Sequence, residues 1–394
     1  MNAILHALFG PKRSSTHVAA LALVAAAAAV PAHAAYVQYD LVSNLPGLAA
    51  VTDPLLVNPW GISRSPTSPF WTSNQGTNTS TLYAVTGSIN VSKVNVAPNG
   101  FVAIPTTAAG PQGPTGQVNN TNTASFQLTP GQASTSARFI FADLNGTISG
   151  WAGASGGATG ASSTVMVSTP GAVYTGLAIN NGGTRLYAAN GALGSIDVFD
   201  GSFAPLSLPG AFVDPNLPAG LVPFNVQNLG GKIYVTYAPA GLAAQRNATP
   251  GQGVVDAFDA NGALLQRVVT GDHLAAPWAL ALAPSSFGEF GGDLLVGNFS
   301  FVASEIDAYD PLTGLFEGSI AIDVGPGNTP GGLWGMMFGS GAGNGGAANT
   351  LYFADGINGE RGGLFGAIVA VPEPGTLALL SLSLAGLVVV RRRA

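Results

Sequence analysis

The sequence predicts an all-β protein that folds as a six-bladed β-propeller between two targeting segments. Glycine and proline account for 55 and 27 of its 394 residues, while charged residues make up only 8%. This composition favours short strands joined by tight turns. A strand-rich unit also recurs six times, and both ends differ from the middle in composition. These observations divide the chain into residues 1–34, 35–370 and 371–394.

The first 34 residues have the features of a secretory signal peptide. Lys12 and Arg13 form a basic region, and an alanine-rich apolar stretch covers residues 18–30. Residues 32–34, Ala-His-Ala, then provide the small-residue cleavage pattern of such peptides. We therefore expect export, with a mature chain that starts near Ala35. Since the sequence has no cysteine, the exported fold must depend on its core rather than on disulfides.

The repeated unit begins with a short apolar strand and continues to a second strand that ends in Asn or Asp. The six units, spaced 49 to 60 residues apart, start at Pro59, Pro114, Tyr174, Pro223, Pro277 and Gly332. Each has room for four strands with their turns, which is one propeller blade. A closed ring buries both faces of every blade, whereas a single blade cannot. A seven-bladed ring and a pair of β-sandwiches are the alternatives.

Closure of the ring requires one more strand. The sixth unit ends with residues 364–369 and has no fourth strand before the tail. Residues 36–42, Tyr-Val-Gln-Tyr-Asp-Leu-Val, form a strand-like segment that belongs to no unit. We predict that this segment completes the sixth blade and so joins the two ends of the propeller.

The C-terminal tail combines three features in a fixed order. They are Val371-Pro372-Glu373-Pro374, an apolar run over residues 377–390, and Arg391-Arg392-Arg393. The apolar run would rise only about 21 Å as a helix, less than a bilayer core of about 30 Å. Arginines stay on the cytoplasmic side of a membrane. A short terminal transmembrane helix of this kind suits a transient hold in the inner membrane.

This tail resembles the PEP-CTERM sorting signal of Gram-negative bacteria. The resemblance implies recognition by an exosortase-type membrane enzyme and cleavage near the Pro-Glu-Pro. An ordinary C-terminal membrane anchor is the alternative. Both interpretations place the body of the protein outside the inner membrane, and sorting would carry it to the cell envelope, the outer surface or the extracellular matrix.

The charge of the predicted mature region excludes one class of partner. Five of the 13 basic residues lie in the terminal segments, which leaves eight basic and 18 acidic residues between Ala35 and Val371, a net charge of −10. Binding to nucleic acid or to another anionic polymer requires clustered Lys and Arg, so neither is expected as a partner.

Three of the five tryptophans lie at or beside the second position of a unit. They are Trp60, Trp278 and Trp334. Because a propeller brings equivalent positions around one axis, these side chains could form an aromatic ring that stacks on a sugar or another flat ligand. The alternative is that they pack between neighbouring blades.

Asparagine and aspartate recur where the second strand of a unit ends. The set comprises Asn74, Asp143, Asn190, Asn298 and Asp355. The asparagines are candidate ligand-binding residues, and Asp143 and Asp355 are candidate ligands for a divalent cation such as Ca²⁺, which prefers oxygen ligands. Alternatively, all five side chains accept hydrogen bonds from backbone N–H groups in turns.

Residues for catalysis are scarce. Of the four histidines, only His273 lies outside the signal peptide, so a multi-histidine metal site is not possible there. Asp272 and His273 form the one acid–imidazole pair, for which a surface turn is the alternative role. The repeat loosely resembles propeller lactonases of the gluconolactonase type, and this implies a divalent metal held by Glu, Asn and Asp near the channel. No unit here begins with an acidic residue, which departs from that pattern.

Residues 58–62, 223–228 and 232–237 also look like parts of a family of exported bacterial propellers that often carry this sorting tail. That family brings no established activity. We therefore expect a non-enzymatic surface or matrix propeller that binds an extracellular polysaccharide or a protein. The competing hypothesis is a metal-dependent hydrolase or lactonase that acts at the channel.

Overall fold

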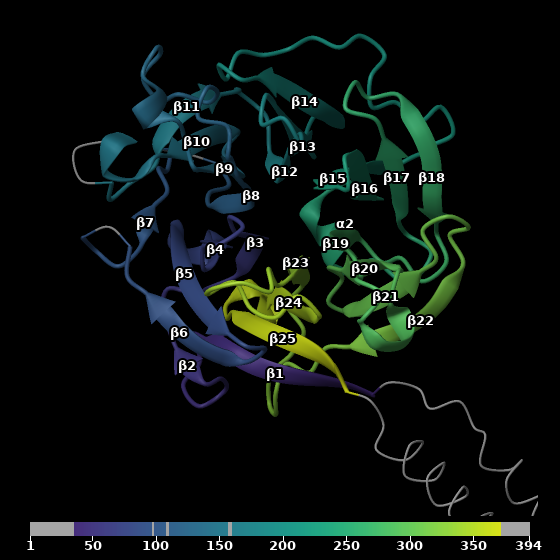
Figure 1. Cartoon of the computed structure of the whole chain (residues 1–394). Helices are drawn as coiled ribbons and strands as arrows, with labels where there is room; N and C mark the ends of the chain where they lie inside the picture. The colour runs from purple at the N-terminus through teal and green to yellow at the C-terminus, as the bar shows by residue number, and fades with distance from the viewer. Residues whose placement is uncertain (1–34, 97, 108–109, 157–159, 372–394) are drawn as a thin grey trace, which may run out of the picture. The chain divides into compact units, whose positions relative to one another are not determined.

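The middle of the chain forms six β-sheets arranged as blades around a central axis (Figure 1). The computed structural model describes residues 35–96, 98–107, 110–156 and 160–371. Residues 36–370 form one compact unit by themselves. The six-bladed propeller predicted from the repeat is therefore confirmed.

Each blade is a β-sheet whose first strand lies innermost. Blades 1 and 2 consist of β3 (Pro59–Ser63), β4 (Phe70–Asn74), β5 (Thr79–Thr86), β6 (Asn90–Val94) and β7 (Val102–Ala103), then β8 (Pro114–Asn119), β9 (Phe139–Asp143), β10 (Thr147–Trp151) and β11 (Thr164–Ser168). Blades 3 and 4 consist of β12 (Tyr174–Ile179), β13 (Arg185–Asn190) and β14 (Ser195–Asp200), then β15 (Leu221–Leu229), β16 (Lys232–Pro239), β17 (Val254–Phe258) and β18 (Leu264–Thr270).

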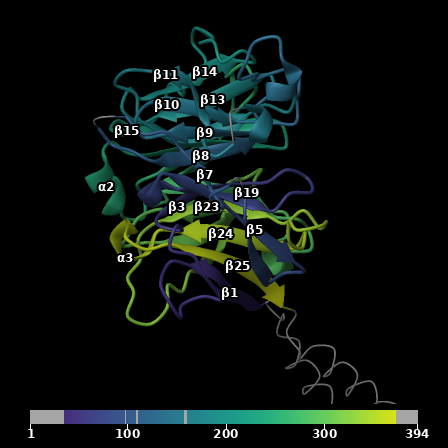
Figure 2. The same cartoon turned by 90° about the vertical axis from the view of Figure 1, so that its left-hand side faces the viewer.

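Blades 5 and 6 complete the ring. They consist of β19 (Pro277–Leu282), β20 (Leu294–Asn298), β21 (Glu305–Tyr309) and β22 (Phe316–Ala321), then β23 (Leu333–Phe338), β24 (Thr350–Asp355), β25 (Leu364–Val371), β1 (Ala35–Ser43) and β2 (Val51–Thr52). Two short helices, α2 (Leu242–Arg246) and α3 (Ile357–Glu360), follow the second strands of blades 4 and 6. Figure 2 shows both helices on one face of the propeller.

The inner strands share a local irregularity near their first residues. The register against the second strand shifts between Pro59 and Ile62 in blade 1, and at the equivalent place in the other five blades. A β-bulge of this kind redirects a side chain. The second residue of each inner strand, which the repeat identified as a special position, therefore lies at a bulge.

Neighbouring inner strands approach so closely that several positions accept only glycine. A Cβ atom on Gly116 would lie 2.2 Å from the backbone nitrogen of Leu177 in the next blade, and one on Gly61 would lie 2.5 Å from the backbone oxygen of Thr115. Gly176 and Gly335 make equivalent contacts with blades 4 and 1. In blade 4 the residue equivalent to Gly116 is Asn225, whose side-chain amide donates to the backbone oxygen of Trp278 in blade 5 at 2.7 Å. The inner strands are thus packed backbone against backbone.

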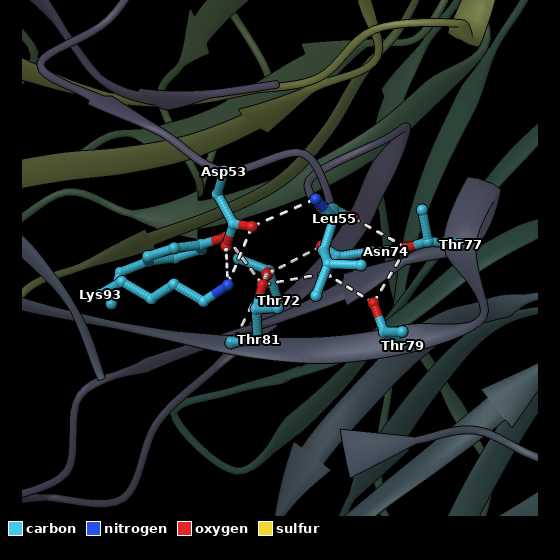
Figure 3. Close-up of polar contacts among 9 residues, drawn as sticks. Asp53, Leu55, Thr72, Asn74, Thr77, Thr79, Thr81 and Lys93 are labelled. Atoms are coloured by element: carbon cyan, nitrogen blue, oxygen red, sulfur yellow. Dashed lines mark hydrogen bonds and ion pairs between the residues drawn. The ribbon is translucent and has the colours of Figure 1, made fainter. Parts of the chain in front are cut away.

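The ring closes through its N-terminal strand. β1 pairs with β25 as the fourth strand of blade 6, as the sequence predicts, and β2 pairs in parallel with β1. Asp53, directly after β2, then connects this blade to blade 1. Its carboxylate, 1% exposed as a residue, accepts from the Tyr83 hydroxyl at 2.8 Å and pairs with the Lys93 ammonium at 2.8 Å (Figure 3).

Blade 3 differs from the prediction of four strands in every unit. Its sheet contains β12, β13 and β14, and residues 201–220 follow as turns and coil with one isolated bridge, Phe199 to Pro205. This stretch contains four prolines, at positions 205, 209, 215 and 218. Proline has no N–H to donate to a strand ladder, so the fourth strand cannot form.

The terminal predictions fall mostly outside the described residues. The signal peptide and the tail from Pro372 onward, including the expected transmembrane helix, belong to the parts that are not described. Within the described ranges, the helices are too short and too polar for a membrane span.

Candidate functional site

The three unit-start tryptophans meet at the propeller axis. The rings of Trp60 and Trp334 stack with centroids 3.4 Å apart, and Trp278 contacts them edge-on at 6.1 and 5.6 Å. Trp60 and Trp278 come from blades 1 and 5, which are not neighbours, so their contact crosses the axis. We call these three residues the tryptophan plug.

Hydrogen bonds fix the plug in place. The indole N–H of Trp278 donates to the backbone oxygen of Thr175 in blade 3, and that of Trp334 donates to the side-chain oxygen of Asn58. All three side chains are at most 4% exposed. The structure therefore places the tryptophans neither between blades nor as an open aromatic ring, but as a filled cluster across the channel.

A cavity of about 330 Å³ lies above the plug and involves all six inner strands. The cavity is lined by residues that lie at and after the bulges of the inner strands, such as Gly61 to Arg64 in blade 1. From blade 5, Trp278 belongs to the lining. Each second strand runs antiparallel to its inner strand, so it ends beside the start of that inner strand. The helices α2 and α3 follow second strands, and they therefore lie on the face of the propeller where the inner strands begin. The cavity therefore opens on the opposite face, at the carboxyl ends of the inner strands.

The lining of the cavity is rich in amides. It includes Gln117, Asn119, Asn180, Asn181, Asn225, Gln227 and Asn228. Gln117 is 5% exposed and donates to the backbone oxygens of Gly61 and Trp71. Its side-chain oxygen is buried without a hydrogen-bond partner among the described residues. A buried amide oxygen without a donor is costly.

Gln227 has a similar arrangement in blade 4. Its side-chain nitrogen donates to the backbone oxygen of Leu280 in blade 5 at 2.8 Å, which holds the amide against the neighbouring inner strand. Asn228 is held in the same way by the backbone oxygen of Ile179 in blade 3. Contacts between blades thus orient the amides before any ligand enters.

The residues that end the second strands lie at the other end of the inner strands. Oδ1 of Asn190 accepts from the backbone N–H of Val173, and Oδ1 of Asn298 accepts from that of Ala275. Asp143 accepts from Gly113 in the same manner. Asn74 instead donates to the hydroxyls of Thr79 and Thr81 within blade 1 (Figure 3). Asn190, Asn298 and Asp143 thus join the loop that enters an inner strand to the strand beside it. None of the residues that end the second strands lines the cavity.

Two of these asparagines also bind an aspartate in the third strand, which the sequence pattern did not single out. Asn190 donates to Asp197 at 2.9 Å, and Asn298 donates to Asp307 at 2.7 Å. Burial raises the pKa of Asp307 to about 6. The signal was present in the sequence as Ile-Asp at the start of the third strands of blades 3 and 5, but periodicity alone does not reveal the pairing.

The candidate metal ligands do not fit a shared cation site. Asp143 and Asp355 belong to blades 2 and 6, and no group of three or more His, Asp or Glu residues suited to a metal ion occurs in the described ranges. Burial raises the pKa of Asp143 to about 6 and that of Asp355 to about 7. Such desolvated carboxyls favour their neutral forms, so we derive no chemistry through a metal.

The acid–imidazole pair is also outside the cavity. His273 stacks on Phe316 of the outer strand β22, with ring centroids 3.8 Å apart. Its Nε2 atom lies 3.7 Å from the Asp272 carboxylate, and both side chains are more than 40% exposed. This pair therefore lies at the periphery of blade 5.

The chain is a six-bladed β-propeller that carries a protein-sorting signal. Residues 370–393 match the PEP-CTERM protein-sorting motif, which implies export, sorting at the cell envelope and exosortase-type processing. This confirms the resemblance seen in the tail, and the matched range contains Val371, Pro372, Glu373, Pro374 and the three arginines.

Two similar proteins that match about two thirds of the chain are uncharacterised. One protein of Acanthamoeba polyphaga mimivirus is 30% identical over 280 residues, covering 68% of this chain and 66% of that protein. A second protein of the same virus is 28% identical over 268 residues, covering 66% of this chain and 67% of that protein. The chain thus spans slightly less than two thirds of the first relative's length.

Solved structures that resemble the chain are more distant. A streptogramin B lyase has a TM-score of 0.48 at 11% identity, covering 86% of this chain and 98% of that one. A gluconolactonase from Xanthomonas campestris has a TM-score of 0.40 at 21% identity, covering 61% and 74%. At these values neither likeness bears on the activity of this chain.

Proposed function

We propose that this exported propeller binds a small polyhydroxylated ligand, the end of an extracellular polysaccharide, in the cavity above the tryptophan plug. The supporting observation is a recess of about 330 Å³, in the size range of small-ligand sites, lined by amides from several blades. Amides both donate and accept hydrogen bonds, as sugar hydroxyls do.

Two further features favour a glycan over a protein partner. Trp278 belongs to the lining, and the small part of this residue that is exposed, 4%, adds apolar surface to the recess. The site is also a concave recess, whereas a stable protein interface spreads over about 800 Å² of surface on each partner. In this proposal, the sorting signal holds the chain briefly at the inner membrane and delivers the propeller to the outer surface or the matrix, where it binds the polysaccharide.

The experiment is a glycan-array screen with the full chain in a sugar-free detergent, followed by titration calorimetry. Gln227→Leu removes one oriented amide from the recess, and we expect it to weaken binding of the selected glycan about five- to tenfold. Gln266→Leu is the matched control, because Gln266 lies in the outer strand of the same blade and bonds to the backbone of residues 311 and 312. Equal effects of both variants, or an empty array, would contradict the proposal.

The metal-dependent hydrolase or lactonase predicted as the alternative has a separate test. Elemental analysis of the dialysed protein would show one bound divalent ion per chain if Asp143, Asp355 or other oxygen ligands held a metal. A stoichiometric ion together with hydrolysis that a chelator abolishes would replace the binding proposal with an enzymatic one.

A further inference from the structure

Arg64 is the one charged side chain among the described residues that line the cavity. It follows the last residue of β3, so it lies at the mouth. Its Nη2 atom donates to the backbone oxygen of Phe338 in blade 6 at 3.1 Å, and Nη1 is 3.5 Å from the backbone oxygen of Ser65. Contacts with two carbonyl groups hold the planar guanidinium in one orientation.

Most of the hydrogen-bonding capacity of this guanidinium is not used. The group has five N–H donors, of which these two contacts use two. The Nε–H is buried without an acceptor among the described residues. Arg64 is half-buried, and this desolvation of the cation lowers its pKa. No carboxylate in the described ranges forms an ion pair with it to offset that cost.

Arg64 has no carboxylate partner although the chain has an excess of carboxylates; among the described residues Arg138, Arg185, Lys232 and Arg361 also have none. The region between the targeting segments has 18 acidic and eight basic residues, so carboxylates are in excess. Lys93, Arg246 and Arg267 each form an ion pair with a carboxylate. Arg64 instead presents its charge to a recess whose other lining residues are uncharged.

We propose that the ligand carries a carboxylate that Arg64 binds at the cavity mouth, so that the recess recognises a sugar acid. This inference rests on the proposed function and names the ligand class. A planar guanidinium forms two parallel hydrogen bonds with a carboxylate, and one cation matches one monoanion. The half-buried amide of Gln227 then binds a hydroxyl of the same ring.

Titration calorimetry with matched sugars tests this inference. The probes are D-glucuronate and D-galacturonate, their short homo-oligomers, the neutral hexoses D-glucose and D-galactose, and acetate. We expect the full chain to bind a uronate or its oligomer at least tenfold more tightly than the neutral counterpart. Raising the salt concentration should weaken only the acidic probes. A difference between free uronate and oligomer identifies the source as a monosaccharide or a chain end.

Substitutions of Arg64 provide the second arm. Arg64→Gln should abolish the preference for the acidic sugar, and Arg64→Lys should retain part of it because the charge remains without the planar fork. Arg138→Gln changes the net charge equally at an exposed position outside the cavity and should leave the preference intact. Thermal unfolding of each variant identifies loss of fold, since Arg64 also contacts blade 6.

Each outcome is decisive. If neutral hexoses bind as tightly as uronates and Arg64→Gln changes nothing, the carboxylate inference is wrong while the proposed sugar site stands. If acetate binds as tightly as the uronates, the site recognises a simple carboxylate and not a sugar acid. If no probe binds, both the inference and the proposed function fail for this class of ligand.

Discussion

At the scale of single residues, the most consequential feature is a set of buried carboxyls without charged partners. Both oxygens of Asp355 are buried and lack a hydrogen-bond donor among the described residues. In blades 3 and 5 the equivalent residue is an asparagine that bonds to a third-strand aspartate. The sequence predicted which residues end the second strands, but not which of them would be unpartnered, because that depends on the facing strand.

Asp355 leads to a prediction about pH. Burial raises its pKa in the folded protein from 3.8 to about 7. Between pH 4 and 7 the folded state therefore keeps a proton on Asp355 that the unfolded state releases. The contribution of the protonated carboxyl to the free energy of unfolding is complete below pH 4 and is lost as pH rises through 7. Asp355→Asn should stabilise the protein at pH 8 by about 2 kcal/mol or more and reduce the fall in melting temperature between pH 5 and 8.

Asp310→Asn is the control for this experiment. Asp310 is exposed, and hydrogen bonds from the backbone of Thr313 and Leu312 lower its pKa. Its substitution should not stabilise the protein at pH 8. If the fall in melting temperature between pH 5 and 8 is the same in Asp355→Asn, the Asp355 carboxyl ionises in the folded protein without a cost in stability. Burial also raises the pKa of Asp256 to about 7. Part of the fall in melting temperature with pH should therefore remain in the Asp355→Asn variant.

At the scale of elements, the N-terminal strands and the residue after them hold the two ends of the ring. The sequence predicted β1 from a strand-like segment without a unit of its own. It did not predict β2 or the Asp53 contacts with blade 1, because a single aspartate in a turn has no distinguishing pattern. It also predicted a fourth strand in blade 3, where spacing allowed one but proline prevented it.

The Asp53–Lys93 ion pair should contribute measurably to closure. The Lys93 side chain is 28% exposed, whereas that of Asp53 is fully buried. Lys93→Met leaves a buried carboxylate without its cation, and we expect a loss of about 1–3 kcal/mol in the free energy of unfolding. Lys232→Met, at an exposed position of β16, is the matched control. Urea unfolding measures both, and Asp53→Asn combined with Lys93→Met should recover part of the loss.

At the scale of the whole molecule, the ring is held by direct contact between inner strands. The repeat predicted the number of blades and the start of each inner strand. It could not identify Arg64, Gln117, Gln227 and Asn228 as one site, because these residues come from three different units and meet only when the ring closes. The sequence interpretation considered the beginnings of the inner strands, whereas the recess lies at their ends.

Gly116 tests how tightly the ring is packed. A methyl group there would meet the backbone of Leu177 and Gly176, which cannot move without displacing blade 3. We expect Gly116→Ala to destabilise the protein by about 3 kcal/mol or more. Gly182→Ala is the control, because a Cβ atom at that site makes only ordinary contacts, the nearest at 3.6 Å. If the two substitutions lower the melting temperature equally, the blades are joined more loosely than the contacts of Gly116 indicate.

The tryptophan plug determines how a polymer could engage this protein. A channel that is filled across its axis has one entrance, so a chain cannot thread through it and only a terminus can enter. The amount of bound protein would then be proportional to the number of polysaccharide ends rather than to the mass of polysaccharide. Cutting a long polymer into fragments would multiply the sites it offers, and capping its ends chemically would remove them while leaving every internal unit intact.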